Sequence, residues 1–180
     1  MEDQISEVHF IMTGGSIDSF YDRRRDTAIP NEKSVIPEFI EGLQLYVKST
    51  FKEVCMKDSR DLNQKDLENI LKAVEETPSK RVIITVGTYK LDTATKYLLD
   101  NLKRKDQIIV LTGSSTPIVG FSPSEDPFNL GYALAIVQDM PKGVYVCFNG
   151  TVFSSDDIIR IIDEGGLARL FKSNPDAPII

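Results

Sequence analysis

Short, nearly uninterrupted apolar runs recur along this chain, and stretches with helical periodicity separate them. The runs, of which residues 81–86 are the clearest, are typical of strands, and the β-branched residues and missing polar alternation of 81–86 indicate a strand covered on both faces. They predict strands over residues 8–13, 51–56, 81–86, 107–111 and 143–148. The periodic stretches predict helices over residues 35–48, 63–76, 91–103 and 156–163, and another that begins at 126. This alternation predicts an α/β fold: a mostly parallel, doubly wound (Rossmann-like) sheet with helices on both faces, in a single domain.

Local signals mark the ends of several of these elements. Ser34 suits the N-cap of the helix over 35–48, and Asn63 with Asp66 three residues later resembles a capping pair. Asn149-Gly150 predicts a tight hairpin turn, after which the chain pairs back on the preceding strand.

Residues 18–33 show neither helical nor strand periodicity. We expect an irregular connection there, of a length typical of functional lids or disordered segments. The basic run Arg23-Arg24-Arg25 within it is flanked by Asp22 and Asp26, which indicates a solvated loop rather than a binding patch. A net charge of −6 and a pI near 4.9 also argue against a nucleic-acid-binding protein.

Polar side chains gather where the predicted strands end. The first strand runs into Gly14-Gly15-Ser16, and glycine permits positive φ and the close approach of another backbone or a ligand. Hydroxyl and carboxyl groups follow four of the strands: Thr13 and Ser16, then Asp58, Ser59 and Asp61, then Thr88, then Thr112 and Ser114. Because the carboxyl ends of parallel strands meet at one edge of a sheet, these groups predict a polar ligand site. Each turn taken alone is more typical of an ordinary solvated loop.

The chain offers little for metal or histidine chemistry. Cys55 and Cys147 both lie in apolar runs and predict buried free thiols. No cluster of Cys and His has metal-ligand spacing, so we expect neither a metal nor a cofactor. His9 is the single histidine and lies inside the first strand, so a hydrolase here would need a different base. The acidic N-terminus has no signal-peptide core and no apolar run has membrane-spanning length, which predicts a cytoplasmic protein that does not enter membranes.

Segments along most of the chain resemble, in order, the motifs of the bacterial-type L-asparaginases. Residues 13–17 (TGGSI) are similar to the TGGTI motif, 58–62 (DSRDL) to DSxDM, and 84–89 (ITVGTY) to ITHGTDT. Residues 109–117 with 126–130 are similar to TGSxRP followed by DGPxNL, residues 143–153 to GVxVxxNGxVF, and 171–173 to FKS. The resemblance implies the N-terminal α/β domain of that family, with a flexible lid.

The resemblance also implies roles for individual residues. Ser16 stands at the first nucleophilic threonine of the family and Thr88 at the second. A serine can attack a carbonyl as a threonine can, once a base removes its proton. The resemblance assigns substrate binding, including that of the developing oxyanion, to residues of the strand-end turns: Gly15, Asp58, Ser59, Gly87, Tyr89 and Ser114.

Several positions depart from the family pattern. Tyr89 replaces the aspartate that binds the α-ammonium group of the substrate and completes the catalytic relay. Arg160 replaces the relay lysine, and arginine stays protonated and does not act as a base. Val86 replaces a histidine, and Ala28 aligns nearest the tyrosine of the lid. Tyr21 would substitute for that tyrosine if the lid folds differently.

These departures leave three interpretations open. The first is an amidohydrolase that uses Ser16 or Thr88 with an altered relay, on a substrate without a free α-amino group. The second is a non-catalytic protein that binds a small carboxylate, and the third is a scaffold whose turns serve folding alone. The resemblance also implies a homo-oligomer, either a dimer or a tetramer. Family members continue into a smaller C-terminal domain after FKS, so we expect one domain over 1–172 and a tail or linker over 173–180.

Overall fold

The computed structural model describes residues 7–120 and 122–163. Its centre is a six-stranded sheet in the order β4-β1-β5-β6-β7-β8, in which β8 is antiparallel to β7 and all other neighbours are parallel. The strands are β1 (Glu7–Gly14), β4 (Lys48–Lys57), β5 (Arg81–Thr85), β6 (Ile108–Thr112), β7 (Gly143–Phe148) and β8 (Thr151–Phe153).

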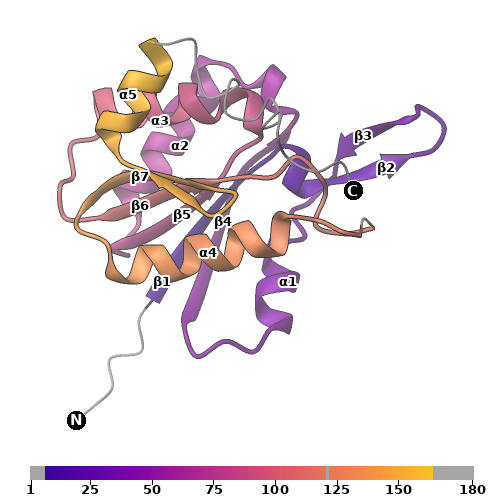
Figure 1. Cartoon of the computed structure of the whole chain (residues 1–180), viewed down its shortest axis with the longest axis horizontal. Helices are drawn as coiled ribbons and strands as arrows, with labels where there is room; N and C mark the ends of the chain where they lie inside the picture. The colour runs from indigo at the N-terminus through magenta and orange to yellow at the C-terminus, as the bar shows by residue number, and fades with distance from the viewer. Residues whose placement is uncertain (1–6, 121, 164–180) are drawn as a thin grey trace.

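Helices cover both faces of this sheet (Figure 1). Helices α2 (Gln64–Glu76), α3 (Leu91–Asn101) and α5 (Ser155–Asp163) cover one face, and α1 (Ile36–Gly42) and α4 (Asp126–Asp139) cover the other. Alternate residues of one strand serve the two layers, since Ile84 packs toward α2 and α3 whereas Ile83 packs toward α4. The predicted single α/β domain with a mostly parallel sheet is therefore confirmed.

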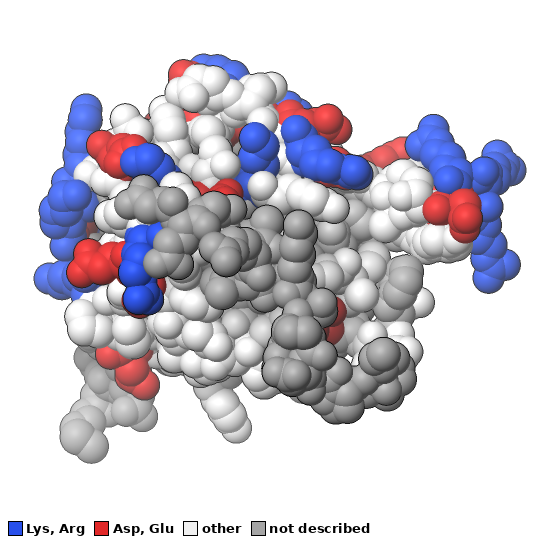
Figure 2. Space-filling model, turned by 45° about the horizontal axis from the view of Figure 1, so that its top comes forward, with Lys and Arg blue, Asp and Glu red and all other residues white. Residues whose placement is uncertain are grey.

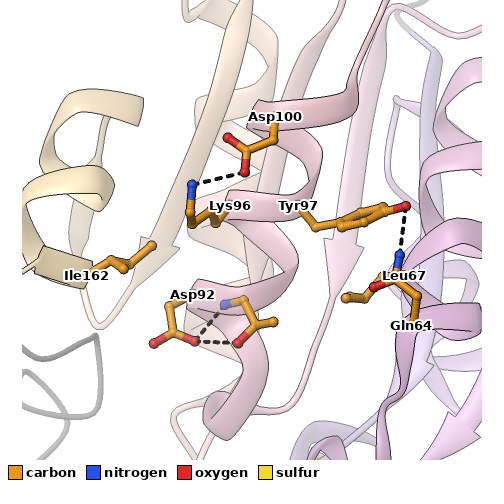
Figure 3. Close-up of a pocket in the computed structure, with 8 residues that line it drawn as sticks. Gln64, Leu67, Asp92, Lys96, Tyr97, Asp100 and Ile162 are labelled. Carbon is orange, nitrogen blue, oxygen red and sulfur yellow. Dashed lines mark hydrogen bonds and ion pairs between the residues drawn. The ribbon is translucent and has the colours of Figure 1, made fainter.

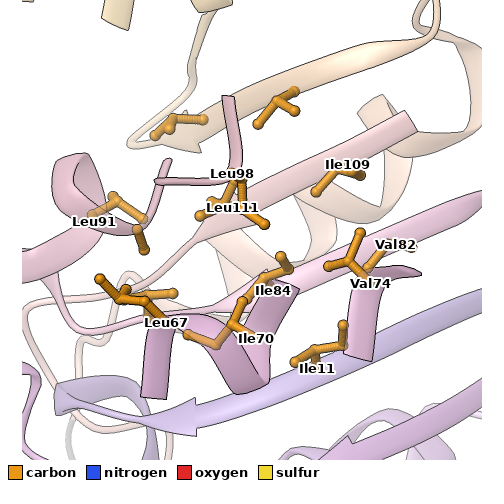
Figure 4. Packing of buried hydrophobic residues seen from close by; sticks show 14 of the residues in the cluster. Ile11, Leu67, Ile70, Val74, Val82, Ile84, Leu91, Leu98, Ile109 and Leu111 are labelled. Atoms are coloured by element: carbon orange, nitrogen blue, oxygen red, sulfur yellow. The ribbon is translucent and has the colours of Figure 1, made fainter. Parts of the chain in front are cut away.

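The core is formed by fully buried aliphatic side chains from every central strand. Figure 4 shows the layer beneath α2 and α3, where Ile11, Ile84 and Leu111 meet Ile70 and Leu98. Burial of each such side chain stabilises the fold by roughly 1.5–3 kcal/mol. This packing holds the strands, and hence the turns at their carboxyl ends, in fixed relative positions.

The capping signal before α2 is confirmed. The Asn63 side chain accepts hydrogen bonds from the Lys65 and Asp66 amides, and the Asp66 carboxylate accepts one from the Asn63 amide at 3.0 Å. The hairpin signal is also confirmed, because Asn149 and Gly150 have φ of 47° and 78° and join β7 to β8.

The predicted helix over 35–48 is wrong in its extent. Helix α1 ends at Gly42, Gln44 takes a left-handed conformation with φ of 52°, and β4 already begins at Lys48. The apolar residues beyond Gly42 therefore do not continue the helix. Ser34 also lies one residue before the N-cap, which is Val35, although its hydroxyl still accepts a hydrogen bond from the Ile36 amide at 3.2 Å. The other predicted elements differ from the structure by a few residues at their ends.

The expected irregular connection over 18–33 is also wrong. After a short 3₁₀ helix η1 (Ser16–Asp18), strands β2 (Ser19–Asp22) and β3 (Thr27–Pro30) form an antiparallel hairpin that projects from the body of the protein (Figure 1). Its turn is closed by the Asp22 carboxylate, which accepts from the Arg24 amide at 2.9 Å, and by Asp26 with φ of 51°. The hairpin lies apart from the main sheet and buries little, so its sequence lacks a strand-like alternation.

The structure shows how far the two cysteines are buried and what the histidine contacts. Cys147 is fully buried, as predicted, whereas Cys55 is only half-buried. The Nδ1 atom of His9 lies 2.8 Å from the hydroxyl of Thr50 on the neighbouring strand. Among the described residues, no helix is long and apolar enough to cross a membrane. Within the same ranges, no three His, Cys, Asp or Glu side chains are grouped so that they could hold a metal ion.

Candidate functional site

The turns after β1 and β5 touch at the carboxyl edge of the sheet. Gly15 has φ of 83°, and a β-carbon added to it would lie 2.5 Å from the Cα atom of Gly87. A β-carbon on Gly87 would in turn lie 2.5 Å from the hydroxyl of Ser59. The Gly15 amide donates to the carbonyl of Lys57 at 2.8 Å, which fixes the same turn against the end of β4. The ends of β1, β4 and β5 therefore meet at this edge. Gly15 and Gly87 can touch only because neither has a side chain.

The two candidate nucleophiles follow these touching glycines. Ser16 begins η1, and Thr88 begins a second 3₁₀ helix, η3 (Thr88–Lys90). Both residues are partly exposed, and neither hydroxyl has a hydrogen-bond partner among the residues that the structure describes. Ser59, at the start of a third 3₁₀ helix, η2 (Ser59–Asp61), is buried against Gly87. The arrangement thus brings Ser16, Ser59 and Thr88 to one place, as the sequence predicts.

Two other strand-end threonines have a structural role. The Thr13 hydroxyl donates to the carbonyl of Thr85 at 2.8 Å, and the Thr112 hydroxyl donates to the carbonyl of Cys147 at the same distance. Both threonines are buried, so these bonds tie neighbouring strands together below the turns.

A cation and an aromatic ring form the rim beside Thr88. The Arg60 guanidinium lies over the Tyr89 ring, 5.4 Å from its centroid, in the geometry of a cation–π contact. Arg60 also donates through Nε and Nη2 to the two carboxylate oxygens of Asp58, and this pairing lowers the pKa of Asp58 below its ordinary value. Tyr89 is 66% exposed. The sequence analysis gave Arg60 no role, because its position lies at the variable place of the DSxDM-like segment.

The β2–β3 hairpin is anchored at its base. The Ser19 hydroxyl donates to the carbonyl of Gly15 at 2.7 Å, and the carboxylate of the buried Asp18 accepts from the Val35 amide at 2.8 Å. Tyr21 lies further along the hairpin, where its exposed hydroxyl donates to the carboxylate of Asp26. The structure therefore directs the Tyr21 hydroxyl toward the hairpin turn.

Arg160 lies on the exposed side of α5. Its guanidinium is 3.4 Å from the carboxylate of Asp157, one turn earlier on the same helix. No contact within the described residues joins Arg160 to Thr88 or Ser16. The structure therefore does not bring Arg160 together with the two candidate nucleophiles.

Ser114 lies behind the rim rather than on it. The residue is fully buried, and its hydroxyl donates to the carbonyl of Thr116 and lies 3.2 Å from a carboxyl oxygen of Asp126. Ser114 thus holds the loop after β6 in place. The sequence predicts a helix that begins at 126, but it does not reveal that Asp126 is buried.

A groove with a volume of about 320 Å³ lies between α2, α3 and the end of α5 (Figure 3). Its polar groups already have partners: Lys96 pairs with Asp100 at 2.9 Å, and Gln64 donates to the hydroxyl of Tyr97 at 3.3 Å. Because the groove offers no free nucleophile, the strand-end turns remain the better candidate for chemistry.

Charged side chains of both signs are interspersed on the face shown in Figure 2. The basic group at its right lies at the tip of the β2–β3 hairpin, where Arg23, Arg24 and Arg25 are exposed. Arg25 pairs with Asp22 at 3.6 Å.

The family of the chain follows from its sequence. The family model described as "Asparaginase, N-terminal" matches residues 7–178. The chain therefore belongs to the asparaginase family and corresponds to its N-terminal domain. No curated protein matches the chain significantly.

Solved L-asparaginases share this fold. The thermostable L-asparaginase from Thermococcus kodakarensis is 24% identical, with a TM-score of 0.69 over 82% of this chain and 45% of that one. A probable cytoplasmic L-asparaginase from Campylobacter jejuni is 23% identical, with a TM-score of 0.67 over 84% of this chain and 48% of that one. The chain thus spans about half the length of the L-asparaginases it resembles.

Proposed function

We propose that this protein is an amidohydrolase that cleaves a primary amide of a small carboxylate substrate through a Ser16 or Thr88 nucleophile. One observation carries the proposal. Two residues whose hydroxyls have no hydrogen-bond partner within residues 7–120 and 122–163 directly follow Gly15 and Gly87, whose backbones touch at the carboxyl edge of the sheet. Open α/β folds bind ligands at this edge.

The proposed reaction has two steps. The hydroxyl oxygen attacks the amide carbonyl, its proton passes to the departing nitrogen, and ammonia leaves as an acyl ester forms on the protein. Water then cleaves the ester, which releases the carboxylic acid and restores the hydroxyl. Because the Gly15 amide already donates to the carbonyl of Lys57, the backbone amides of Ser16 and Thr88 are the ones suited to stabilise the oxyanion that develops in each step.

The rim favours a substrate without an α-ammonium group. Arg60 and Tyr89 occupy the rim beside Thr88, and Arg60 already engages the carboxylate of Asp58 in a bidentate pair. An ammonium group on the substrate would therefore meet a guanidinium rather than a free carboxylate. Succinamate, a primary amide with one carboxylate and no amino group, fits this description.

A binding protein without catalysis is the second candidate. Within the described residues, no basic side chain forms a hydrogen bond with Ser16 or Thr88, and Arg160 pairs with Asp157 instead. A nucleophile without a base would react slowly, whereas the same turns would still bind a carboxylate.

Ammonia release from a panel of amides tests the proposal. The panel contains L-asparagine, L-glutamine, succinamate, glutaramate and butyramide. We expect turnover of succinamate that exceeds turnover of L-asparagine and that falls at least about 10³-fold in the responsible variant, Ser16→Ala or Thr88→Ala. Thr93→Ala, an exposed threonine on α3, is the matched control and should leave the rate unchanged.

The two candidate functions give different results in this experiment. No release from any amide, together with a rise in melting temperature when succinamate is added, would replace the amidohydrolase with the binding protein. Release that persists in both Ser16→Ala and Thr88→Ala would contradict the proposed nucleophiles.

We further propose a cytoplasmic homo-oligomer, a dimer or a tetramer, that acts on a small molecule rather than on nucleic acid or membranes. Residues 1–172 would form its domain and 173–180 a tail or linker; residues 164–180 lie outside the described part of the chain. Membership of the asparaginase family supports the small-molecule substrate.

A further inference from the structure

Two adjacent carboxyl groups at the start of α4 have opposite surroundings. Glu125 accepts hydrogen bonds from the Ser115 amide and the Thr116 hydroxyl. Asp126 is 0% exposed, and its Oδ1 atom has no hydrogen-bond partner among the described residues. Two donors thus stabilise a negative charge on Glu125, and none does so at Oδ1 of Asp126.

The remaining contact of Asp126 identifies which group holds the proton. The Ser114 hydroxyl has one hydrogen and two neighbours: the carbonyl oxygen of Thr116, which can only accept, and a carboxyl oxygen of Asp126, which can donate when it is protonated. The hydrogen therefore points to Thr116. The 3.2 Å contact between Ser114 Oγ and Asp126 Oδ2 then needs its hydrogen from Asp126, because two lone pairs would otherwise face each other.

We infer that Asp126 is a protonated carboxylic acid that donates to the Ser114 hydroxyl and so positions the turn that carries Ser16. The path between the two runs through one loop. Ser114 and Thr116 fix the start of the loop after β6, and two residues later the Ile118 amide donates to the carbonyl of Ile17 at 3.2 Å. Ile17 directly follows Ser16, so Asp126 is a positioning residue for the candidate nucleophile.

The charged groups around Asp126 also favour its neutral form. Burial is the main cause that raises the pKa of Asp126 to about 8; the contact with Ser114 opposes this rise, and the carboxylates of Glu125 and of Asp18 on η1 contribute to it. No lysine or arginine within the described residues offsets these charges. Ionisation of Asp126 would therefore place a second buried charge near Asp18. Asp18 ends η1, the 3₁₀ helix that begins with Ser16.

This arrangement makes the stability of the protein depend on pH with a defined sign. Asp126 ionises near pH 4 in the unfolded chain and near pH 8 in the folded protein, so the folded state binds its proton more tightly. The resulting stabilisation is fully present below about pH 4 and is lost as the pH rises toward 8, by up to about tenfold in the folding equilibrium per pH unit.

The variant Asp126→Asn tests the inference, because an amide keeps a donor for Ser114 and does not ionise. We expect its folding equilibrium, relative to wild type, to improve by up to about tenfold per pH unit between pH 5 and 7 and to level off above 8. Asp100→Asn, at an exposed position of α3, should show no such slope. A flat or reversed difference would show that Asp126 is charged in the folded protein and would overturn the inference.

Hydrogen exchange at the Ile118 amide tests the positioning role separately. We expect the protection of this amide in wild type, relative to Asp126→Asn, to fall as the pH rises. Comparing the two proteins at each pH cancels the intrinsic exchange rate. Equal protection in both proteins from pH 5 to 9 would contradict the positioning role. If Asp126→Asn does not fold, a ¹³C titration of the Asp126 carboxyl in wild type decides, since a transition below pH 5 would contradict the inference. None of these readouts uses a substrate, so their failure leaves the proposed amidohydrolase activity untouched.

Discussion

At the scale of the residue, the candidate site depends on two contacts that leave no room for side chains and on one backbone hydrogen bond. Gly15 touches Gly87, Gly87 touches Ser59, and the amide of Gly15 bonds to the end of β4. These contacts place Ser16 and Thr88 next to each other although 72 positions separate them in the sequence, as the numbering shows. Their geometry is therefore set by backbone contacts rather than by hydrogen bonds between the two side chains.

Gly15→Ala should disrupt this geometry. The added methyl group would lie 2.5 Å from backbone atoms of Gly87, at a position whose φ of 83° already disfavours a side chain. We expect a loss of stability of about 1–3 kcal/mol and a loss of any amide turnover, measured by urea unfolding and ammonia release.

Gly131→Ala is the matched control for that variant. Gly131 lies in the interior of α4 with open space around it, so alanine there should stabilise the protein by about 0.5–1 kcal/mol. If the two variants changed stability equally, the tight contact between Gly15 and Gly87 would not exist in solution.

At the scale of the element, the start of α2 combines a cap with an ion pair. The Asp66 carboxylate accepts from the Asn63 amide and lies 2.9 Å from the Lys57 ammonium at the end of β4. Burial alone would raise the pKa of Asp66, but these two partners outweigh it and hold the pKa below its ordinary value. The helix is thereby tied to the strand that leads to Ser59.

Asp66→Asn should destabilise the protein in a pH-dependent manner. The folded pKa of Asp66 is lowered, so its contribution is present above the unfolded value near 4 and is lost as the pH falls through the folded value. Because Lys57 is partly exposed, we expect a loss of about 1 kcal/mol at pH 7 that shrinks below pH 4. A loss that stayed constant between pH 7 and pH 3 would contradict this account of the ion pair.

Much of the fold was predictable from the sequence, and the failures have physical causes. The inner parallel strands β5 and β6 were predictable because both faces of each strand are buried, so its sequence is mostly apolar. The β2–β3 hairpin was not, since it packs against little and its turn depends on local bonds of Asp22. The C-terminal end of α1 was not predictable either. The left-handed residue that follows it is Gln44, and the glycine that usually marks such a position in a sequence is absent there.

The candidate site was predictable in part. The sequence placed Ser16, Ser59 and Thr88 at one edge because their strands are parallel. It did not reveal the contact between Arg60 and Tyr89, which depends on side-chain directions in two 3₁₀ helices. The burial of Asp126 was hidden for a similar reason, since an aspartate at a helix start is ordinarily exposed and charged.

At the scale of the whole molecule, the chain corresponds to the N-terminal domain of the asparaginase family and spans about half the length of the L-asparaginases it resembles. The residues of the proposed site come from the ends of β1, β4 and β5. The account therefore predicts that the described domain supplies the nucleophile by itself.

Capture of the acyl intermediate tests that claim most directly. Wild-type protein is mixed with succinamate, quenched in acid and analysed by intact mass and peptide mapping. We predict an added succinyl group on a peptide that contains Ser16 or Thr88, absent in the corresponding alanine variant and retained in Thr93→Ala. Release of ammonia from succinamate with no adduct on either residue, at quench times shorter than one turnover, would contradict the account.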